Sequence, residues 1–269
     1  MSEELILNNG IKMPSVGIGG WAQNKEDILN ALRIGYRMID TAAQYGNEEE
    51  IGCAVKDSGV RREDVFVTTK IWTQDIRSGR TYAAFEDSLK RLGMDYVDLL
   101  LIHWPASGFE DAWIEMEKVY KAGKTRAIGV SNFEWHHLEE LKLNGATVPP
   151  AVNQIESHPY FANQEIIEMG RKSGIVAVAW CPLGGPGSGE LQDQVIKEIA
   201  TQNRKTPAQV ILKWHLQRGV VVIPKSSKPE RMKENMNIFD FELSESDMSR
   251  IALLEQGKRL GAHPDNFDF

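Results

Sequence analysis

The sequence predicts an α/β fold, a (β/α)8 TIM barrel, and three observations support this prediction. Short β-branched runs alternate with amphipathic helical runs along all 269 residues, and no low-complexity linker interrupts them. Most of the β-branched runs are continuously apolar, which is typical of strands that are buried on both faces of a parallel sheet. There are eight such units with short connections, as a closed barrel requires. We therefore expect residues 1–269 to form one (β/α)8 barrel domain.

The strands and helices of the barrel follow from these runs. Between the strands, apolar residues recur at three- and four-residue spacing, as in amphipathic helices. Many of these helical segments end at a glycine, which is a common helix stop. The eight strands are expected at residues 16–21, 36–42, 65–72, 96–104, 125–132, 151–156, 175–183 and 220–226.

Two segments fall outside the repeat. Residues 5–14 (LILNNGIKMP) contain an Asn-Gly turn between short extended runs, so we expect an N-terminal β-hairpin that covers the floor of the barrel. Residues 244–257 (SESDMSRIALLEQG) have the spacing of an extra C-terminal helix, and an irregular tail follows them. The hairpin and this helix are therefore expected as additions to the barrel.

A dinucleotide-binding Rossmann fold is the main alternative. Residues 17–22 spell G-x-G-x-x-A after a strand, and Asp40 ends the next strand about 20 residues on, as that fold requires. The next helix, however, is expected to begin only near Lys25, with Asn24 as its N-cap, so the glycines would not place a pyrophosphate on its first turn. Eight units also exceed the six strands of that fold. The barrel is the better interpretation.

The composition restricts the classes of partner. The net charge of −7 argues against a nucleic-acid-binding surface, which needs clustered Lys and Arg. The first residues lack the basic start and apolar run of a signal peptide, and the longest apolar stretch is far shorter than a membrane span. Cys53 and Cys181 are too few for a disulfide framework. We expect a cytoplasmic protein without nucleic-acid or membrane partners, and a monomer, because nothing in the sequence requires a partner.

Polar and aromatic side chains end most of the expected strands. In a parallel barrel all strands deliver their last residues to one rim, where active sites lie. A barrel does not need ionisable groups there for its stability, so their convergence indicates function. The residues concerned are Trp21, Asp40, Lys70, Trp72, His103, Trp104, Ser131, Asn132, Gln154, Glu156, Trp180, Lys225 and Ser226.

Tyr45, in the loop after the second strand, is a candidate proton donor. A phenol has an ordinary pKa of about 10, so it donates a proton near neutral pH only if its anion is stabilised. Lys70 on the neighbouring strand can supply a positive charge, and Asp40 can hold the ammonium group in place. His103 can donate a hydrogen bond to a substrate oxygen. Together these groups would protonate a developing alkoxide.

Each of these residues also has a structural explanation when it is taken alone. Asp40 and Lys70 can form an ion pair that only supports the scaffold, since such pairs also occur there. His103 can be a hydrogen-bonded core histidine, and Tyr45 a surface aromatic residue. Four coincidences on one rim are hard to explain structurally, and the combination therefore favours catalysis.

Patterns of the S/T-x-x-E/Q type predict helix N-caps at three places. They are Ser131 with Glu134, Thr206 with Gln209, and Ser227 with Glu230. Pro229 suits the first turn of the third helix. A helix N-terminus is also a natural anion site, and barrels often bind phosphate after strands 7 and 8. The residues that would surround an anion there are Lys225, Ser226, Lys228 and Arg231.

A metal site is not expected. His136 and His137 are adjacent on an exposed helix, so their side chains should diverge. No HExxH or paired-cysteine spacing occurs. His158, His215 and His263 are isolated in the sequence and are given no role.

Several long motifs in the same order resemble the aldo-keto reductase family over nearly the whole chain. Within that family, AWCPLG (179–184) and the HPD of the tail (263–265) resemble the bacterial 2,5-diketo-gluconate reductase type. The motifs are GYRMIDTAAQYGNEEEIG (35–52), TTKIW (68–72), VDLLLIHWP (97–105), AIGVSNF (127–133), VNQIE (152–156) and IPKSSKPERMKEN (223–235).

The resemblance implies a catalytic tetrad and an NADP(H) site. In the tetrad Tyr45 is the general acid, Lys70 and Asp40 tune it, and His103 orients the carbonyl group. The residues implied for the nicotinamide are Ser131, Asn132 and Gln154 at the carboxamide and Trp180 stacked on the ring. Those implied for the rest of NADPH are Lys225, Ser226 and Arg231 at the 2′-phosphate, with Glu234 and Asn235 near the adenine.

The resemblance also implies the substrate contacts Trp21, Trp72 and Trp104. The loops 105–111 and 183–191 and the C-terminal tail are shorter than is usual in the family. Because these segments normally set substrate choice, we expect an open pocket and broad specificity.

The expected activity is NADPH-dependent reduction of small aldehydes, ketones or keto-sugars to alcohols, by hydride transfer from nicotinamide C4 with a tyrosine general acid. Two alternatives remain open at this point. One is a Schiff-base lyase barrel in which Lys70 attacks a carbonyl carbon. The other is a non-catalytic barrel that binds NADPH as a sensor or scaffold.

Overall fold

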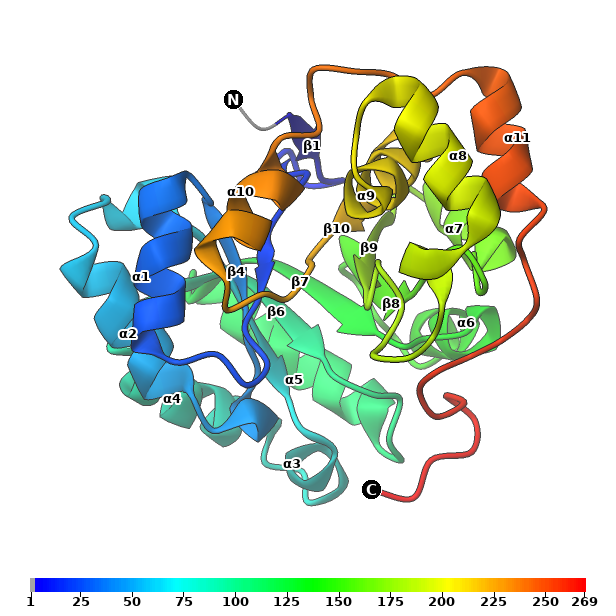
Figure 1. Cartoon of the computed structure of the whole chain (residues 1–269). Helices are drawn as coiled ribbons and strands as arrows, with labels where there is room; N and C mark the ends of the chain where they lie inside the picture. Colours follow the sequence, from blue (N-terminus) through cyan, green and yellow to red (C-terminus); the bar gives the residue numbers. More distant parts are fainter. Residues whose placement is uncertain (1–2) are drawn as a thin grey trace.

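The computed structural model describes residues 3–269 and contains a closed barrel of eight parallel strands (Figure 1). The strand order follows the sequence without a crossover, from β3 to β10. The ring closes where Val16 forms a parallel bridge with Val222 and the Gly17 N–H donates to the Val222 carbonyl at 2.8 Å. The predicted (β/α)8 fold is confirmed. The strands are β3 (Ile18–Gly19), β4 (Met38–Asp40), β5 (Phe66–Ile71), β6 (Val97–Ile102), β7 (Thr125–Ser131), β8 (Val152–Glu156), β9 (Val176–Trp180) and β10 (Val221–Val222).

Helices cover the outside of the barrel between successive strands. Their apolar faces meet the outer faces of the strands in one large cluster of buried side chains. Three single-turn 3-10 helices occur at Ala43–Tyr45 (η1), Arg62–Asp64 (η2) and Glu190–Gln192 (η3). The α-helices are α1 (Lys25–Ile34), α2 (Glu48–Asp57), α3 (Thr73–Arg77), α4 (Thr81–Leu92), α5 (Phe109–Lys121), α6 (Trp135–Leu143), α7 (Gln164–Lys172), α8 (Gln194–Asn203), α9 (Pro207–Gln217), α10 (Pro229–Met236) and α11 (Glu245–Ala252).

The two additions to the barrel occur where they were predicted. Strands β1 (Glu4–Ile6) and β2 (Lys12–Pro14) form an antiparallel hairpin. Its Leu7 and Met13 pack with Met38 and Phe66, which begin β4 and β5, so the hairpin covers the N-terminal end of the barrel. At the other end of the chain, α11 is the extra helix, and it stops before the predicted residue 257.

The glycines that suggested a Rossmann fold serve a different purpose. Helix α1 begins at Lys25, and Asn24 caps it as predicted, so no helix starts at the glycine pattern. A Cβ atom on Gly19 would lie 2.9 Å from the Ile223 carbonyl oxygen, and one on Gly20, which is adjacent but not one of the two pattern glycines, would lie 2.7 Å from that of Asp40. Both distances are too short for a side chain. The glycines therefore let the first strand approach its two neighbours closely.

Several strands are shorter than the apolar runs that predicted them. The run 220–226 contributes only β10, and the run 16–21 only β3. Pro224 lacks an N–H group for a ladder, and the residues beyond it leave the sheet toward the rim. None of the helices in residues 3–269 is long and apolar enough to cross a membrane.

Candidate active site

Asp40 and Lys70 form a buried ion pair at the C-terminal end of neighbouring strands. Both side chains are almost fully buried, and the Lys70 ammonium donates to Asp40 Oδ1 and, at 2.9 Å, to the Thr41 carbonyl. The ammonium also donates to the Tyr45 hydroxyl at 3.4 Å. Asp40 Oδ2 accepts from Gln154 Nε2 at 2.7 Å, so its carboxylate is held from both sides. This arrangement fixes the ammonium group beneath the phenol.

Tyr45 and His103 face each other across the same rim. Tyr45 belongs to η1, directly after β4, and His103 follows β6. Their ring centroids are 5.7 Å apart at an interplanar angle of 75°. His103 is buried, and its Nδ1 has no hydrogen-bond partner among residues 3–269. A buried imidazole nitrogen without a partner is costly in a protein interior. The imidazole ring as a whole lies beside the phenol, where it can meet the same ligand oxygen. The fold therefore brings together the four residues predicted from the sequence, which are Asp40, Tyr45, Lys70 and His103.

Burial and Lys70 set the protonation states of these groups. Burial, with a smaller contribution from the Lys70 charge, holds the pKa of His103 well below 6.5, so the ring is neutral at neutral pH. Burial tends to lower the pKa of Lys70, but Asp40 and Tyr45 outweigh it and raise that pKa above 10.5. The side chain is therefore a stable ammonium group.

Tyr45 departs from the sequence expectation in one respect. The positive charge of Lys70 was expected to lower its pKa, but burial outweighs that charge and raises the pKa above 10.0. The phenol keeps its proton at neutral pH, which is the state of a general acid. An alkoxide is a stronger base than a phenolate, so the proton can still move to a newly formed alkoxide.

A second group of polar side chains lies beside this tetrad, at the ends of β7 and β8. Ser131 Oγ donates to the Gln154 carbonyl at 2.8 Å, and Asn132 Nδ2 donates to the His103 carbonyl at 3.1 Å. Trp180 Nε1 donates to Asn132 Oδ1 at 2.8 Å. Asn132 has a left-handed backbone (φ 62°), which turns its side chain back toward the rim. Gln154 uses its amide nitrogen on Asp40, so its Oε1 can accept a hydrogen bond from a carboxamide.

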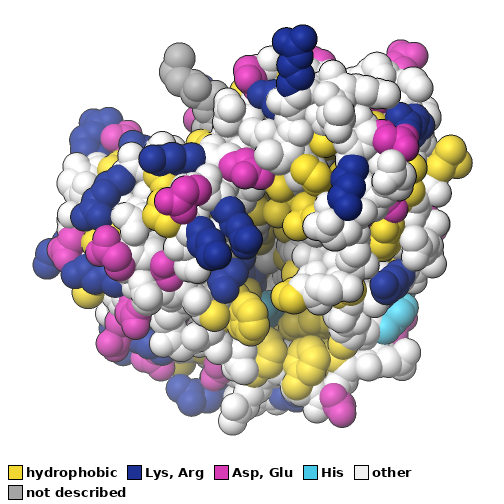
Figure 2. Space-filling view, viewed as in Figure 1, with side chains coloured by type: hydrophobic (Ala, Val, Ile, Leu, Met, Phe, Trp, Pro, Cys, Tyr) yellow, Lys and Arg dark blue, Asp and Glu magenta, His cyan; other side chains and the backbone are white. Residues whose placement is uncertain are grey.

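The segment after β10 carries positive charges without acidic partners. Lys225 and Arg231 are exposed, Ser226 is buried, and the Ser226 hydroxyl accepts from the Lys228 N–H at 3.1 Å. Within residues 3–269 no carboxylate pairs with Lys225, Lys228 or Arg231. Figure 2 shows Lys and Arg side chains gathered over α10, beside a hollow in this face of the molecule. The segment is suited to an anion.

The helix caps predicted in this region are partly wrong. Helix α10 begins at Pro229 with Lys228 as its N-cap, so Ser227 and Glu230 form no capping box. Helix α6 is capped by Glu134 and His137, and the Ser131 hydroxyl is used on Gln154 instead. In both cases the chain starts its helix later than the Ser-x-x-Glu pattern implied.

Helix α9 begins as predicted, but two residues of α10 lie in surroundings that were not expected. The predicted Thr206–Gln209 capping box is present. Glu234, which was expected near an adenine, accepts a hydrogen bond from the Thr206 hydroxyl at 2.6 Å, and Asn235 is only 2% exposed. The Glu234 side chain thus joins α10 to the start of α9, and Asn235 is buried.

The C-terminal tail covers two of the three candidate substrate tryptophans. Phe269 stacks on Trp72 with centroids 5.5 Å apart, and it meets Trp104 edge-on at 5.1 Å. Phe267 packs on Trp104 at 5.2 Å. Trp21 remains 64% exposed. The tail was expected to leave the pocket open, and that expectation is wrong for the side formed by the other two indoles, because the tail crosses the rim.

Figure 1 shows the course of this tail, in red, from α11 along the barrel to a point near α3. There Arg77 Nη1 donates to the Phe269 carbonyl oxygen at 2.8 Å. Sequence analysis missed these aromatic contacts. The only signal was the NFDF ending, in which two phenylalanines alternate with polar residues.

His136 and His137 converge, contrary to the sequence expectation. The Nε2 atoms of the two rings lie 3.1 and 3.3 Å from Asp265 Oδ1, and their centroids are 4.0 Å apart. His137 Nδ1 accepts from the Glu134 N–H at 3.1 Å, so the neutral ring carries its proton on Nε2 and directs it to Asp265. Burial lowers the pKa of His137 to about 4. These contacts attach the C-terminal tail to α6.

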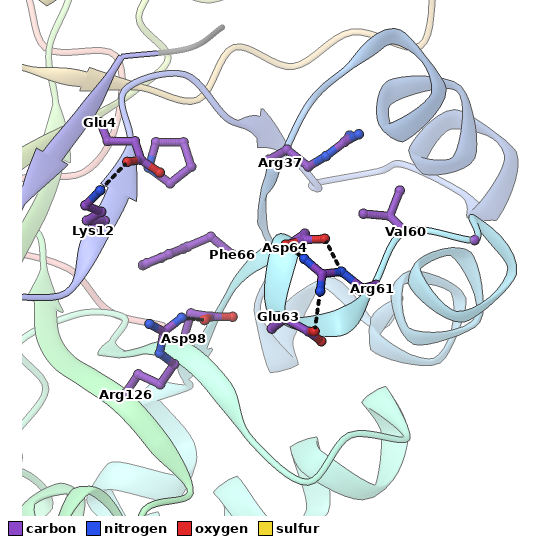
Figure 3. A pocket seen from close by; sticks show the side chains of 12 residues that line it. Glu4, Lys12, Arg37, Val60, Arg61, Glu63, Asp64, Phe66, Asp98 and Arg126 are labelled. Carbon is purple, nitrogen blue, oxygen red and sulfur yellow. Dashed lines mark hydrogen bonds and ion pairs between the residues drawn. The ribbon is translucent and has the colours of Figure 1, made fainter.

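A further cavity, of about 630 Å³, lies at the opposite end of the barrel, under the hairpin (Figure 3). Its charged side chains neutralise one another. Arg61 pairs with Glu63 and Asp64, and Arg126 pairs with the buried Asp98. These charged groups around the cavity are therefore already paired with their neighbours.

Comparisons with known proteins identify the family of this chain. The model of the Aldo/keto reductase family matches residues 17–256. A glyoxal reductase of Bacillus subtilis is 48% identical, and the alignment covers 100% of this chain and 99% of that protein. The methylglyoxal reductase DkgA of Escherichia coli is 42% identical over 97% of this chain and 96% of its own length. The crystal structure of MGS-M4, an aldo-keto reductase from a Medee basin deep-sea metagenome library, superposes with a TM-score of 0.94 at 41% identity, covering 98% of this chain and 100% of that one.

Proposed function

Because the chain belongs to the aldo/keto reductase family, we propose that it uses NADPH to reduce the carbonyl group of small aldehydes, ketones or keto-sugars to an alcohol. The observation that carries the proposal is the buried Lys70–Asp40 pair directed at the Tyr45 hydroxyl, with the imidazole ring of His103 beside the phenol ring. The names of two relatives, a glyoxal reductase and a methylglyoxal reductase, make small oxoaldehydes the first substrates to test.

The proposed mechanism assigns one task to each side chain. When bound beside these side chains, NADPH would supply the hydride that the carbonyl carbon accepts. The neutral imidazole of His103 orients the substrate by a hydrogen bond to its carbonyl oxygen. Tyr45 donates its phenolic proton to the same oxygen as negative charge develops there. Lys70 stabilises the phenolate that remains, and Asp40 keeps the ammonium group in position.

The residues around the rim fit the cofactor. Gln154 Oε1 and the Ser131–Asn132 pair offer hydrogen-bonding atoms for the carboxamide, and the indole of Trp180 offers a flat surface for the ring. The unpaired cations Lys225 and Arg231, with Ser226, suit a 2′-phosphate, which is present in NADPH and absent from NADH. Glu234 and Asn235 lie on the same helix and remain proposed neighbours of the adenine.

A Schiff-base lyase is the less favourable proposal. Such an enzyme needs a neutral lysine amine that can reach the substrate. Lys70 is fully buried, and its raised pKa keeps it as an ammonium group paired with Asp40. Borohydride in the presence of a carbonyl substrate is expected to trap no adduct on this side chain. The non-catalytic alternative is tested by the activity assays below, and the cytoplasmic location and the monomeric state remain predictions.

The Arg231→Ala variant is expected to raise KM for NADPH by about 10- to 100-fold, because one charge-assisted hydrogen bond to phosphate contributes about 1.5–3 kcal/mol. KM for NADH should change by less than about 2-fold, since NADH has no 2′-phosphate. Steady-state kinetics with both cofactors measure the difference. Lys233→Ala is the matched control, because it removes a cation from another side of α10. Equal losses with the two cofactors would remove the 2′-phosphate assignment.

The rate of reduction is expected to be nearly independent of pH between the ordinary pKa values of His, 6.5, and Tyr, 10.0. The pKa of His103 is lowered, so the ring is already neutral at the acid end of this range. The pKa of Tyr45 is raised, so the proton is still present at the alkaline end. The measurement is kcat/KM across the range at constant ionic strength, with the decay of NADPH without enzyme subtracted. A titration with its midpoint inside the range contradicts these protonation states.

A further inference from the structure

His158 is a fully buried histidine that the proposed mechanism does not use, and it lies between two buried carboxylates. Its Nε2 is 3.1 Å from Glu156 Oε1, at the end of β8. Its Nδ1 is 2.7 Å from Glu190 Oε1, at the start of η3, in an ion pair rather than a well-aligned hydrogen bond. All three side chains are at most 1% exposed. A neutral imidazole has only one N–H donor, and an ionised carboxylate has none. Contacts at both nitrogens therefore indicate an imidazolium cation.

The surroundings of the ring support this charge. Burial tends to lower the pKa of His158, but the two glutamates outweigh it and raise that pKa above 6.5. Two other titratable groups near the cluster are His215 on α9 and Cys181 after β9. Burial holds the pKa of His215 well below 6.5, so this ring is neutral. Cys181 keeps an exposed surface, but desolvation of its thiol and the charges of Glu156 and Glu190 raise its pKa to about 11, so it is neutral too. Because these groups are neutral, they do not repel the imidazolium cation.

Arg218, at the end of α9, is a cation close to this cluster. It donates to the Ser157 hydroxyl at 3.4 Å and to the Ala162 carbonyl at 2.7 Å. Its guanidinium therefore binds residues on either side of His158, and the two carboxylates remain paired with the imidazolium.

One carboxylate of the cluster holds the C-terminal tail. Glu156 accepts hydrogen bonds from the backbone N–H groups of Leu260 and Gly261, the second at 3.0 Å. Gly261 lies against the indole of Trp180, and a Cβ atom there would come within 2.6 Å of the ring. Glu156 thus holds the tail against Trp180, on which the nicotinamide ring is proposed to stack.

The other carboxylate holds the glycine-rich segment 183–191. A Cβ atom on Gly184 would lie 2.3 Å from Glu190 Oε2 and 2.4 Å from the Ser188 hydroxyl. Gly184 has a φ of 72°, so the segment turns sharply around the carboxylate. Because Glu190 is bound to His158, this turn is tied to the same cation as the tail.

We propose that His158 is a positioning residue: as an imidazolium it fastens both the 183–191 segment and the C-terminal tail to the ends of β8 and β9, and so controls the affinity of the site for its ligands. The expected effect on kinetics rests on the proposed function, because it takes Trp180 and the tail-covered Trp72 and Trp104 as parts of the cofactor and substrate sites. The expected effect on the mobility of the two segments does not.

The test compares His158→Gln with the double variant His158→Gln/Glu190→Gln. The single variant leaves two buried carboxylates without a cation, and the double variant removes one of these charges. In His158→Gln, amide hydrogen exchange in peptides covering 183–191 and 258–263 should be at least about 10-fold faster. KM for NADPH and for methylglyoxal should rise about 10-fold, with kcat changed by less than about 3-fold. The second substitution should restore most of the exchange protection and of both KM values.

Glu117→Gln is the control for a general loss of stability. Glu117 is also a buried carboxylate, and it binds Thr147 and Val148 beside α5, away from both segments. If His158→Gln changes exchange and KM no more than Glu117→Gln does, or if Glu190→Gln gives no rescue, the proposal is overturned. If His158→Gln fails to fold, the single variant Glu190→Gln is still expected to speed amide hydrogen exchange in residues 183–191. Exchange at the wild-type rate in Glu190→Gln would also overturn the proposal. Amide hydrogen exchange can be measured without enzyme turnover. An inactive protein would therefore refute the proposed function, but the exchange experiment would still test the role of His158.

Discussion

Tyr45→Phe is expected to lower kcat for carbonyl reduction by about 10²- to 10⁴-fold, the usual contribution of a general acid. The variant removes one oxygen atom and keeps the ring that faces His103. The Kd for NADPH should stay within about 2-fold, because no proposed cofactor contact uses the phenol. Single-turnover absorbance of the reduced nicotinamide gives the rate, and fluorescence titration gives the Kd.

Tyr82→Phe is the matched control for this variant, since Tyr82 lies on α4 on the outside of the barrel. It should reduce methylglyoxal at the wild-type rate. A Tyr45→Phe variant with the same rate as Tyr82→Phe would remove the tyrosine from the mechanism, whatever the cofactor.

Lys70→Met is expected to lower both stability and activity. The substitution leaves the Asp40 carboxylate buried without a cation, which costs about 3–5 kcal/mol in the free energy of unfolding. It also removes the charge that stabilises the Tyr45 phenolate, so kcat should fall by at least about 10²-fold. Urea denaturation and single-turnover kinetics measure the two effects separately.

The double variant Lys70→Met/Asp40→Asn separates stability from catalysis. It removes both charges of the pair, so most of the lost stability should return, while kcat should stay as low as in Lys70→Met. Recovery of kcat together with stability would mean that the ion pair serves only the scaffold, which is the structural explanation that the sequence left open.

The fold and the meeting of the tetrad could be predicted because both follow from local pattern and barrel geometry. Continuous apolar runs identified the strands, and a parallel barrel brings their last residues to one rim. Asp40, Lys70 and His103 therefore had to converge once the strands were placed. The family resemblance, confirmed by the match over residues 17–256, added the roles that were expected of them.

The errors concern features that depend on contacts between distant segments. Adjacent histidines on a helix normally diverge, but His136 and His137 converge because the tail brings Asp265 between them. The path of that tail, which places Phe267 and Phe269 on the rim, has no local signature in the sequence. Contacts of this kind are made only when the chain is folded.

The direction of the pKa shift of Tyr45 could not be predicted for a related reason. The sequence indicated a neighbouring positive charge, which lowers the pKa of a phenol. It gave no measure of burial, which raises that pKa and is the larger effect. The Ser-x-x-Glu pattern failed at Ser131 because a backbone carbonyl of the next strand takes its hydroxyl.

The most direct test of the proposed activity follows the hydride itself. Purified protein is incubated with methylglyoxal and NADPH that carries deuterium at C4 on either face of the nicotinamide, and the alcohol is analysed by mass spectrometry and NMR. We expect the protein to consume NADPH, to prefer it to NADH, and with one of the two labelled forms to place deuterium on the former carbonyl carbon. Consumption of neither cofactor across a panel of aldehydes, ketones and keto-sugars, or an alcohol without deuterium from both labelled forms, would contradict it.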